Sequence, residues 1–162
     1  MPEEPLSPLI LAARWASNDL YGEQMPALAA DLLEAGFDSP SLRRLAGEMH
    51  ITRSADLELL VSATFRELGI HYPLSDKEGR LIASRQIARE VIHGRRNPWA
   101  AATHLEIRVW SWHCGIPEIL RIFDLNDQPK WDSPFRPPVS KLEQEMYDAF
   151  ARLAIINPND LV

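Results

Sequence analysis

The stretch Ser54–Leu68, SADLELLVSATFREL, indicates the fold class more clearly than any other part of the 162-residue chain. Its inward positions fall 3, 4, 7, 8 and 11 residues after the first of them, which is the spacing of one helix face and not the alternation of a strand. These positions are Leu57, Leu60, Val61, Thr64, Phe65 and Leu68. Gly69 follows directly, and a glycine just past such a segment is typical of a helix end.

Helix signals of three kinds recur along the chain: Ser or Asn before a proline, a Ser-x-x-Glu capping box, and a closing glycine. They stand at Ser39-Pro40 and Asn97-Pro98, at Ser75–Glu78 and Ser140–Glu143, and at Gly36, Gly69 and Gly94. Together with the apolar spacing they predict helices over about 8–18, 26–35, 40–47, 54–68, 76–93, 99–112, 117–123 and 140–156. No segment alternates like a half-buried strand.

The expected fold is therefore all-α: an irregular bundle of about eight helices, built from helical hairpins and without a sheet. The segment Trp99–Trp112 is apolar on several faces, so it is expected to be the central helix. Length favours a single helical domain over residues 1–162, with a proline-rich loop at 124–139.

Composition limits the classes of protein. Hydrophobic residues make up 46% and charged residues 25%, which is ordinary globular usage and excludes disorder for the bulk of the chain. No apolar run approaches the ~18 residues of a membrane span, and the region around Leu6–Ala13 lacks a basic flank, so no secretory signal is expected. One cysteine, Cys114, excludes an internal disulfide and favours a cytoplasmic location.

The net charge of −6 is unevenly distributed. Residues 1–60 hold 4 basic and 10 acidic side chains, residues 61–108 hold 8 and 5, and residues 109–162 hold 5 and 8. Either these segments neutralise one another, or the first forms an acidic surface that attracts a basic partner. The candidate partner-facing residues are Asp31, Glu34 and Asp38. An overall acidic balance disfavours nucleic acid as a partner.

No constellation of residues predicts an enzyme. Glu90 and His93 share one helix face, but the di-iron carboxylate pattern needs a second such pair, and His104 adds none. His113 and Cys114 are neighbours in sequence and would not face one another on a helix. Serine-hydrolase, P-loop and dinucleotide motifs are absent from the sequence. We therefore expect no catalytic residue, no metal and no cofactor.

Two further features carry alternatives. The hairpin at 26–49 would present Arg43 and Arg44 on its second helix, which suggests a DNA-binding regulator, but its acidic side chains would repel phosphates. Trp131, in the proline-rich loop, is either a partner-binding anchor or a ring that pins the loop to the bundle. Self-association stays open under every interpretation.

The segments 27–47, ALAADLLEAGFDSPSLRRLAG, and 88–102 resemble runs found in small uncharacterised bacterial all-helical proteins. Some of these are similar in size, charge and class to immunity proteins, which neutralise toxins. That resemblance transfers no individual residue. It implies a non-enzymatic protein-binding domain, an immunity-type inhibitor of a basic toxin. The alternative is a small-molecule-binding or metal-dependent helical enzyme, with Glu90, His93 and His104 as its candidates.

Overall fold

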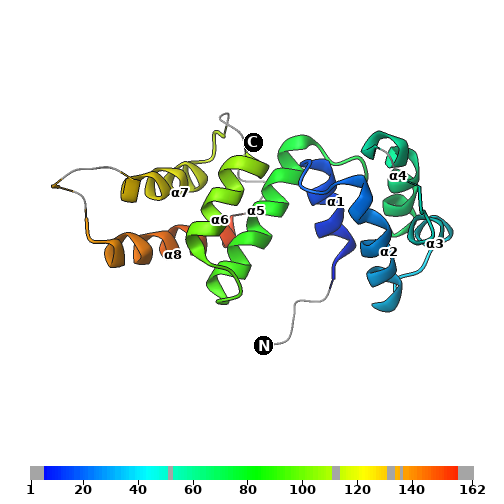
Figure 1. The fold of residues 1–162 in the computed structure, drawn as a ribbon, viewed down its shortest axis with the longest axis horizontal. Helices are drawn as coiled ribbons and strands as arrows, with labels where there is room; N and C mark the ends of the chain where they lie inside the picture. Colours follow the sequence, from blue (N-terminus) through cyan, green and yellow to red (C-terminus); the bar gives the residue numbers. More distant parts are fainter. Residues whose placement is uncertain (1–5, 51–52, 111–113, 131–133, 136, 157–162) are drawn as a thin grey trace. The chain divides into compact units, whose positions relative to one another are not determined.

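The structure, a computed structural model, describes residues 6–50, 53–110, 114–130, 134–135 and 137–156. This part of the chain contains eight α-helices and no strand, which confirms the all-α prediction (Figure 1). The helices are α1 (Pro8–Ala16), α2 (Met25–Glu34), α3 (Pro40–Ala46), α4 (Glu58–Glu67), α5 (Asp76–Ile92), α6 (Pro98–His104), α7 (Pro117–Asp127) and α8 (Val139–Ile155). Short 3-10 turns η1 (Gly22–Gln24), η2 (Ser54–Leu57) and η4 (Gln128–Lys130) and the π-turn η3 (Leu105–Val109) adjoin them.

The chain divides into two compact units, Met1–Gly79 and Arg80–Val162, each with a hydrophobic core of its own. The boundary falls inside α5, four residues after that helix begins. The expectation of a single domain over residues 1–162 stays a prediction.

The first unit is built on the predicted helical hairpin. α2 packs against α3, α3 packs against α4, and α1 also touches α4. The segment Ser54–Leu68 places its predicted inward positions in or beside the core. Four of them are buried and two are half-buried: Leu57, Val61, Thr64 and Phe65, and Leu60 and Leu68. The largest fully buried side chains of this core are Met25, Leu32, Leu42, Leu45 and Phe65.

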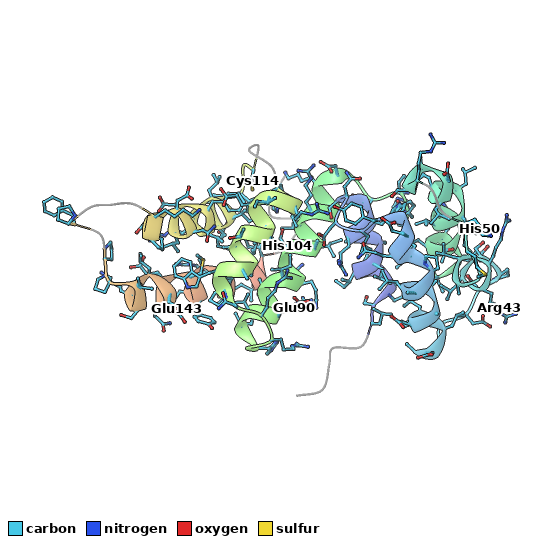
Figure 2. All side chains as sticks on the ribbon, in the orientation of Figure 1. Arg43, His50, Glu90, His104, Cys114 and Glu143 are labelled. Carbon is cyan, nitrogen blue, oxygen red and sulfur yellow. The ribbon has the colours of Figure 1, made fainter. Side chains whose placement is uncertain are left out.

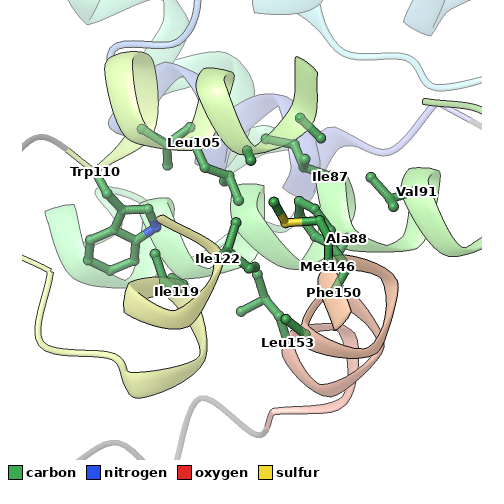
Figure 3. Close-up of a cluster of buried hydrophobic side chains, with 14 of the residues drawn as sticks. Ile87, Ala88, Val91, Leu105, Trp110, Ile119, Ile122, Met146, Phe150 and Leu153 are labelled. Carbon is green, nitrogen blue, oxygen red and sulfur yellow. The ribbon is translucent and has the colours of Figure 1, made fainter. Parts of the chain in front are cut away.

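The second unit surrounds a core to which α5, α6, α7 and α8 all contribute (Figure 3). The sequence predicts one helix over 99–112, but α6 ends at His104 and continues as the π-turn η3, closed by Trp110 N donating to Leu105 O at 2.8 Å. The wider turn keeps Val109 and Trp110 both buried, although they are neighbours in sequence. Trp112 lies outside the described residues.

Most of the helix-end signals that the sequence predicts are found in the structure. The Ser39 hydroxyl accepts from Leu42 N at 3.1 Å, and Asn97 Oδ1 accepts from two amides of α6. Ser75 and Glu78 form the reciprocal capping box, at 2.9 and 3.2 Å. The three closing glycines, Gly36, Gly69 and Gly94, have positive φ angles of 94°, 82° and 70°. Such angles are strained for other residues, so glycine is required there.

Two further predicted features are wrong. Ser140 does not cap α8, because the helix begins at Val139 with Pro138 as its N-cap, so the Ser140–Glu143 box does not form. The loop expected to begin at residue 124 is helical to Lys130. Burial explains the longer helix, since Leu125 is fully buried and Asn126 is 5% exposed. The Asn126 side chain also donates to Thr103 and Glu106, at 3.3 and 3.2 Å.

Candidate functional site

The predicted partner-facing carboxylates lie at one end of the α2–α3 hairpin. Asp31 and Glu34 stand three residues apart on α2, so they project from the same side of the helix, and both are exposed. Among the described residues neither carboxylate has a hydrogen bond or an ion pair. α2 carries no basic side chain in its last turn, where the helix dipole is itself negative. The free charges are therefore concentrated at a negative helix end.

Asp38 belongs to the same surface but is paired. Arg43 Nε donates to Asp38 Oδ1 at 2.7 Å, and the second nitrogen of the guanidinium donates to the other carboxylate oxygen. This bidentate pair lowers the pKa of Asp38 and raises the pKa of Arg43, in both cases chiefly through the hydrogen bonds. Arg43, labelled in Figure 2, thus offsets part of the acidic surface and is itself less available to phosphates. The pairing weakens the DNA-binding alternative.

Aromatic side chains near these carboxylates and in the proline-rich segment are candidate anchors. Phe37, between Glu34 and Asp38, is 36% exposed, although its amide closes α2 by donating to Leu32 O at 3.0 Å. Phe135 is 91% exposed. Trp131, the predicted anchor of the proline-rich loop, lies outside the described residues.

The residues of the enzyme alternative are used differently in the second unit. Glu90 forms an ion pair with Arg96 at 3.1 Å, and the exposed His93 Nδ1 lies 3.3 Å from a guanidinium nitrogen of Arg95. Glu90 and His104 come from α5 and α6 (Figure 2). Across the described ranges no three His, Cys, Asp or Glu side chains are grouped as metal ligands.

Cys114 is a free thiol and is buried. Burial raises the pKa of this thiol, and the raised pKa disfavours the thiolate that a nucleophile needs. His113 lies outside the described residues, so its relation to Cys114 stays untested.

A cavity of about 500 Å³ in the first unit was not predicted from the sequence. Its described lining residues are Trp15, Ala16, Asn18, Leu20, Tyr21, Ser54, Ala55, Glu58, Tyr72, Leu74 and Asp76. The Glu58 carboxylate accepts three hydrogen bonds: from Trp15 Nε1 at 2.9 Å, from Ser62 Oγ at 3.3 Å and from the Tyr72 hydroxyl at 3.5 Å. Burial, the charge of Glu58 and this hydrogen bond raise the pKa of Tyr72 to about 12.

A second cavity of about 520 Å³ lies against α3 and α4. Its lining is mixed, because it includes Arg44 and His50 as well as Glu48 and Asp56, beside leucines of α4. His50 is labelled in Figure 2. Opposite charges within one wall select no single class of ligand.

No local sequence signal reveals the first cavity. Trp15 and Glu58 are 43 residues apart, and Tyr72 is 14 residues beyond Glu58. Only folding brings these three side chains together.

In the part of the chain that the structure describes, no helix is both long enough and apolar enough to cross a bilayer. Comparison with protein-family models, with curated proteins and with solved structures finds no match to this chain.

Proposed function

We propose that this chain is a non-enzymatic protein-binding domain, a bacterial cytoplasmic inhibitor of the immunity type, whose first unit docks onto a basic protein. The observation that carries the proposal is the division of charge. Residues 1–79 hold 13 acidic and 6 basic side chains, a formal charge of −7, whereas residues 80–162 hold 10 and 11, a charge of +1. The whole negative balance therefore belongs to the first unit.

Within that unit, Asp31 and Glu34 form the docking surface together with Phe37. The two unpaired carboxylates supply long-range attraction, which accelerates encounter with a partner of opposite charge. The exposed ring of Phe37 supplies an apolar contact of the kind that anchors an interface. Asp38 contributes less, because Arg43 already neutralises it.

The test compares two double variants of the full chain as bait in a lysate of the source cell. Asp31→Lys/Glu34→Lys reverses the proposed surface, and Glu143→Lys/Asp148→Lys makes the same change of charge on α8 of the second unit. Wild type and the α8 variant are expected to capture the same basic protein in stoichiometric amount, and the α2 variant is expected to lose it.

The captured protein is then purified, and its association rate is measured against salt concentration. Electrostatic attraction of exposed charges is screened over ~8 Å at physiological salt and ~3 Å at 1 M, so the α2 variant should associate roughly tenfold more slowly at low salt and nearly normally at 1 M. Equal rates for the two double variants at low salt would refute the assignment of this surface.

A further inference from the structure

The cavity of the first unit is the strongest feature outside the proposed docking surface. Its volume of about 500 Å³ lies within the range of roughly 300–1,000 Å³ that is usual for small-molecule sites. Its walls come from four parts of the unit: the end of α1, the segment that leads to η1, the η2–α4 start, and the segment that leads into α5. The site is thus assembled by the tertiary fold of one unit.

Hydrogen bonds hold the walls of this cavity in place. Ser54 accepts from the amide of Gly22 at 2.9 Å and joins η2 to η1. Arg14 pairs at 3.0 Å with Asp19, whose side chain is only 4% exposed, and so fixes the turn after α1. Asn18 lies within that turn at the cavity wall, with a φ of +57°, a conformation that asparagine adopts more readily than most residues. A site with fixed walls loses less entropy on binding.

The charge of the lining is negative. Glu58 and Asp76 are its charged members, and none of its described residues is Lys, Arg or His. Both carboxylates belong to the first turns of α4 and α5, where each helix end supplies a partial charge of only about +0.5. The full negative charge of Glu58 exceeds the partial positive charge of the α4 end. The lining therefore favours a cation over an anion.

Aromatic side chains complete the lining. Trp15 and Tyr72 are nearly buried, at 7% and 8% exposure, and Tyr21 is 48% exposed. Aromatic rings attract ammonium groups within about 6 Å of the ring face, and tryptophan does so most strongly. The indole N–H of Trp15 donates to Glu58, so ring and carboxylate form one fixed pair. Glu58 has about four lone-pair positions, and Trp15, Ser62 and Tyr72 occupy three of them. The carboxylate is therefore able to accept from a ligand N–H.

From this combination we propose that the cavity is a binding site for a small organic ammonium ion. The ammonium group lies against the Glu58 carboxylate, and the carbon substituents lie against Trp15, Tyr21 and Tyr72. The site is separate from the α2 surface, since the cavity lining includes no residue of α2. Its existence does not depend on the proposed inhibitor function.

The test uses the full chain and three probes of similar size: benzylammonium, neutral benzyl alcohol and anionic benzoate. Binding is followed by NMR through the indole N–H signal of Trp15, assigned with Trp15→Phe, and by calorimetry. Benzylammonium is expected to shift the Trp15 signal in a saturable manner, and to bind at least tenfold more tightly than either other probe. Equal binding of the ammonium and the alcohol, or no saturable shift with benzylammonium, overturns the proposal.

Two variants locate the site and separate charge from shape. Glu58→Gln keeps the size of the side chain and removes its charge, and it is expected to weaken benzylammonium roughly tenfold. Ala55→Trp fills an exposed part of the wall without a change of charge and is expected to abolish binding. Glu143→Gln makes the same neutralisation on α8 and should bind as wild type does. Circular dichroism confirms that each variant is folded, and unchanged affinity in folded Glu58→Gln and Ala55→Trp would refute the site.

Discussion

The hydroxyl of Ser84 connects two parts of the second unit, and its removal tests how the core is held. Ser84 is fully buried in α5, where its hydroxyl donates to Arg80 O at 2.7 Å and accepts from Trp110 Nε1 at 2.6 Å. Trp110 closes the π-turn and is 5% exposed. Ser84→Ala leaves the buried indole N–H without its acceptor.

The magnitude follows from these contacts. An orphaned buried donor costs about 1–3 kcal/mol, so about 2 kcal/mol is expected from the indole N–H. Alanine is a better helix former than serine by about 0.5 kcal/mol, which reduces the net loss to about 1.5 kcal/mol. With a urea m-value of about 2 kcal/mol/M, the unfolding midpoint should fall by about 0.8 M. Ser140→Ala, at an exposed position of α8, should change stability by less than about 0.5 kcal/mol.

The assay is urea unfolding of wild type, Ser84→Ala, Trp110→Phe and the double variant, followed by circular dichroism. Phenylalanine has no N–H, so Ser84→Ala should cost almost nothing in the Trp110→Phe background. The two single effects should then differ from additivity by more than about 1 kcal/mol, beyond the ~0.5 kcal/mol usual for independent sites. If Ser84→Ala costs the same in both backgrounds, the hydrogen bond is not the source of its contribution.

Three other predictions concern the first unit. Gly79→Ala should destabilise the protein by at least about 1 kcal/mol, although alanine is the better helix former, because the new Cβ would lie 2.9 Å from Ala16 Cβ and 3.2 Å from Ala13 O. Gly47→Ala is the control, since its Cβ would meet nothing closer than 3.6 Å. In the same melting experiment the control should be tolerated. The hydrogen bonds with Ser75 lower the pKa of Glu78. The stability that these bonds provide is therefore present above pH 4.5 and is lost as the pH falls below it. When the free energy of unfolding is measured against pH, Glu78→Gln should show a shallower fall on the acid side than wild type. Glu58→Gln should bring the pKa of Tyr72 below its value of about 12, because the substitution removes the neighbouring negative charge. The absorbance of tyrosinate measures this pKa. An unchanged titration would mean that burial alone raises the pKa of Tyr72.

Local signals allowed much of the fold to be predicted. Ser39, Asn97 and Ser75 cap helices as expected, because a capping contact involves only residues two or three positions away. Ser140 shows the limit of this reasoning, since Pro138 is the N-cap of α8 and the helix therefore begins two residues too early for the capping box. The π-turn at Leu105–Val109 was missed for a different reason: the burial of Trp110 against Ser84 joins positions 26 residues apart.

The candidate sites were predictable to different degrees. Exposure of Asp31 and Glu34 follows from their place opposite the apolar stripe of α2, so spacing alone was sufficient. The pairing of Asp38 with Arg43 depends on the path of the turn between two helices, which spacing does not specify. The cavity around Glu58 was beyond prediction, since its walls come from segments spread over sixty residues of the first unit.

The division into two units has a consequence for synthesis of the chain. Every core residue of the acidic unit precedes residue 80, so its packing needs nothing that the ribosome makes later. The 83 residues of the second unit take about 4–17 s to translate at ~5–20 residues per second, which is far longer than helical hairpins need to fold. The nascent chain can therefore present its negatively charged half, folded, while the second half is still being made.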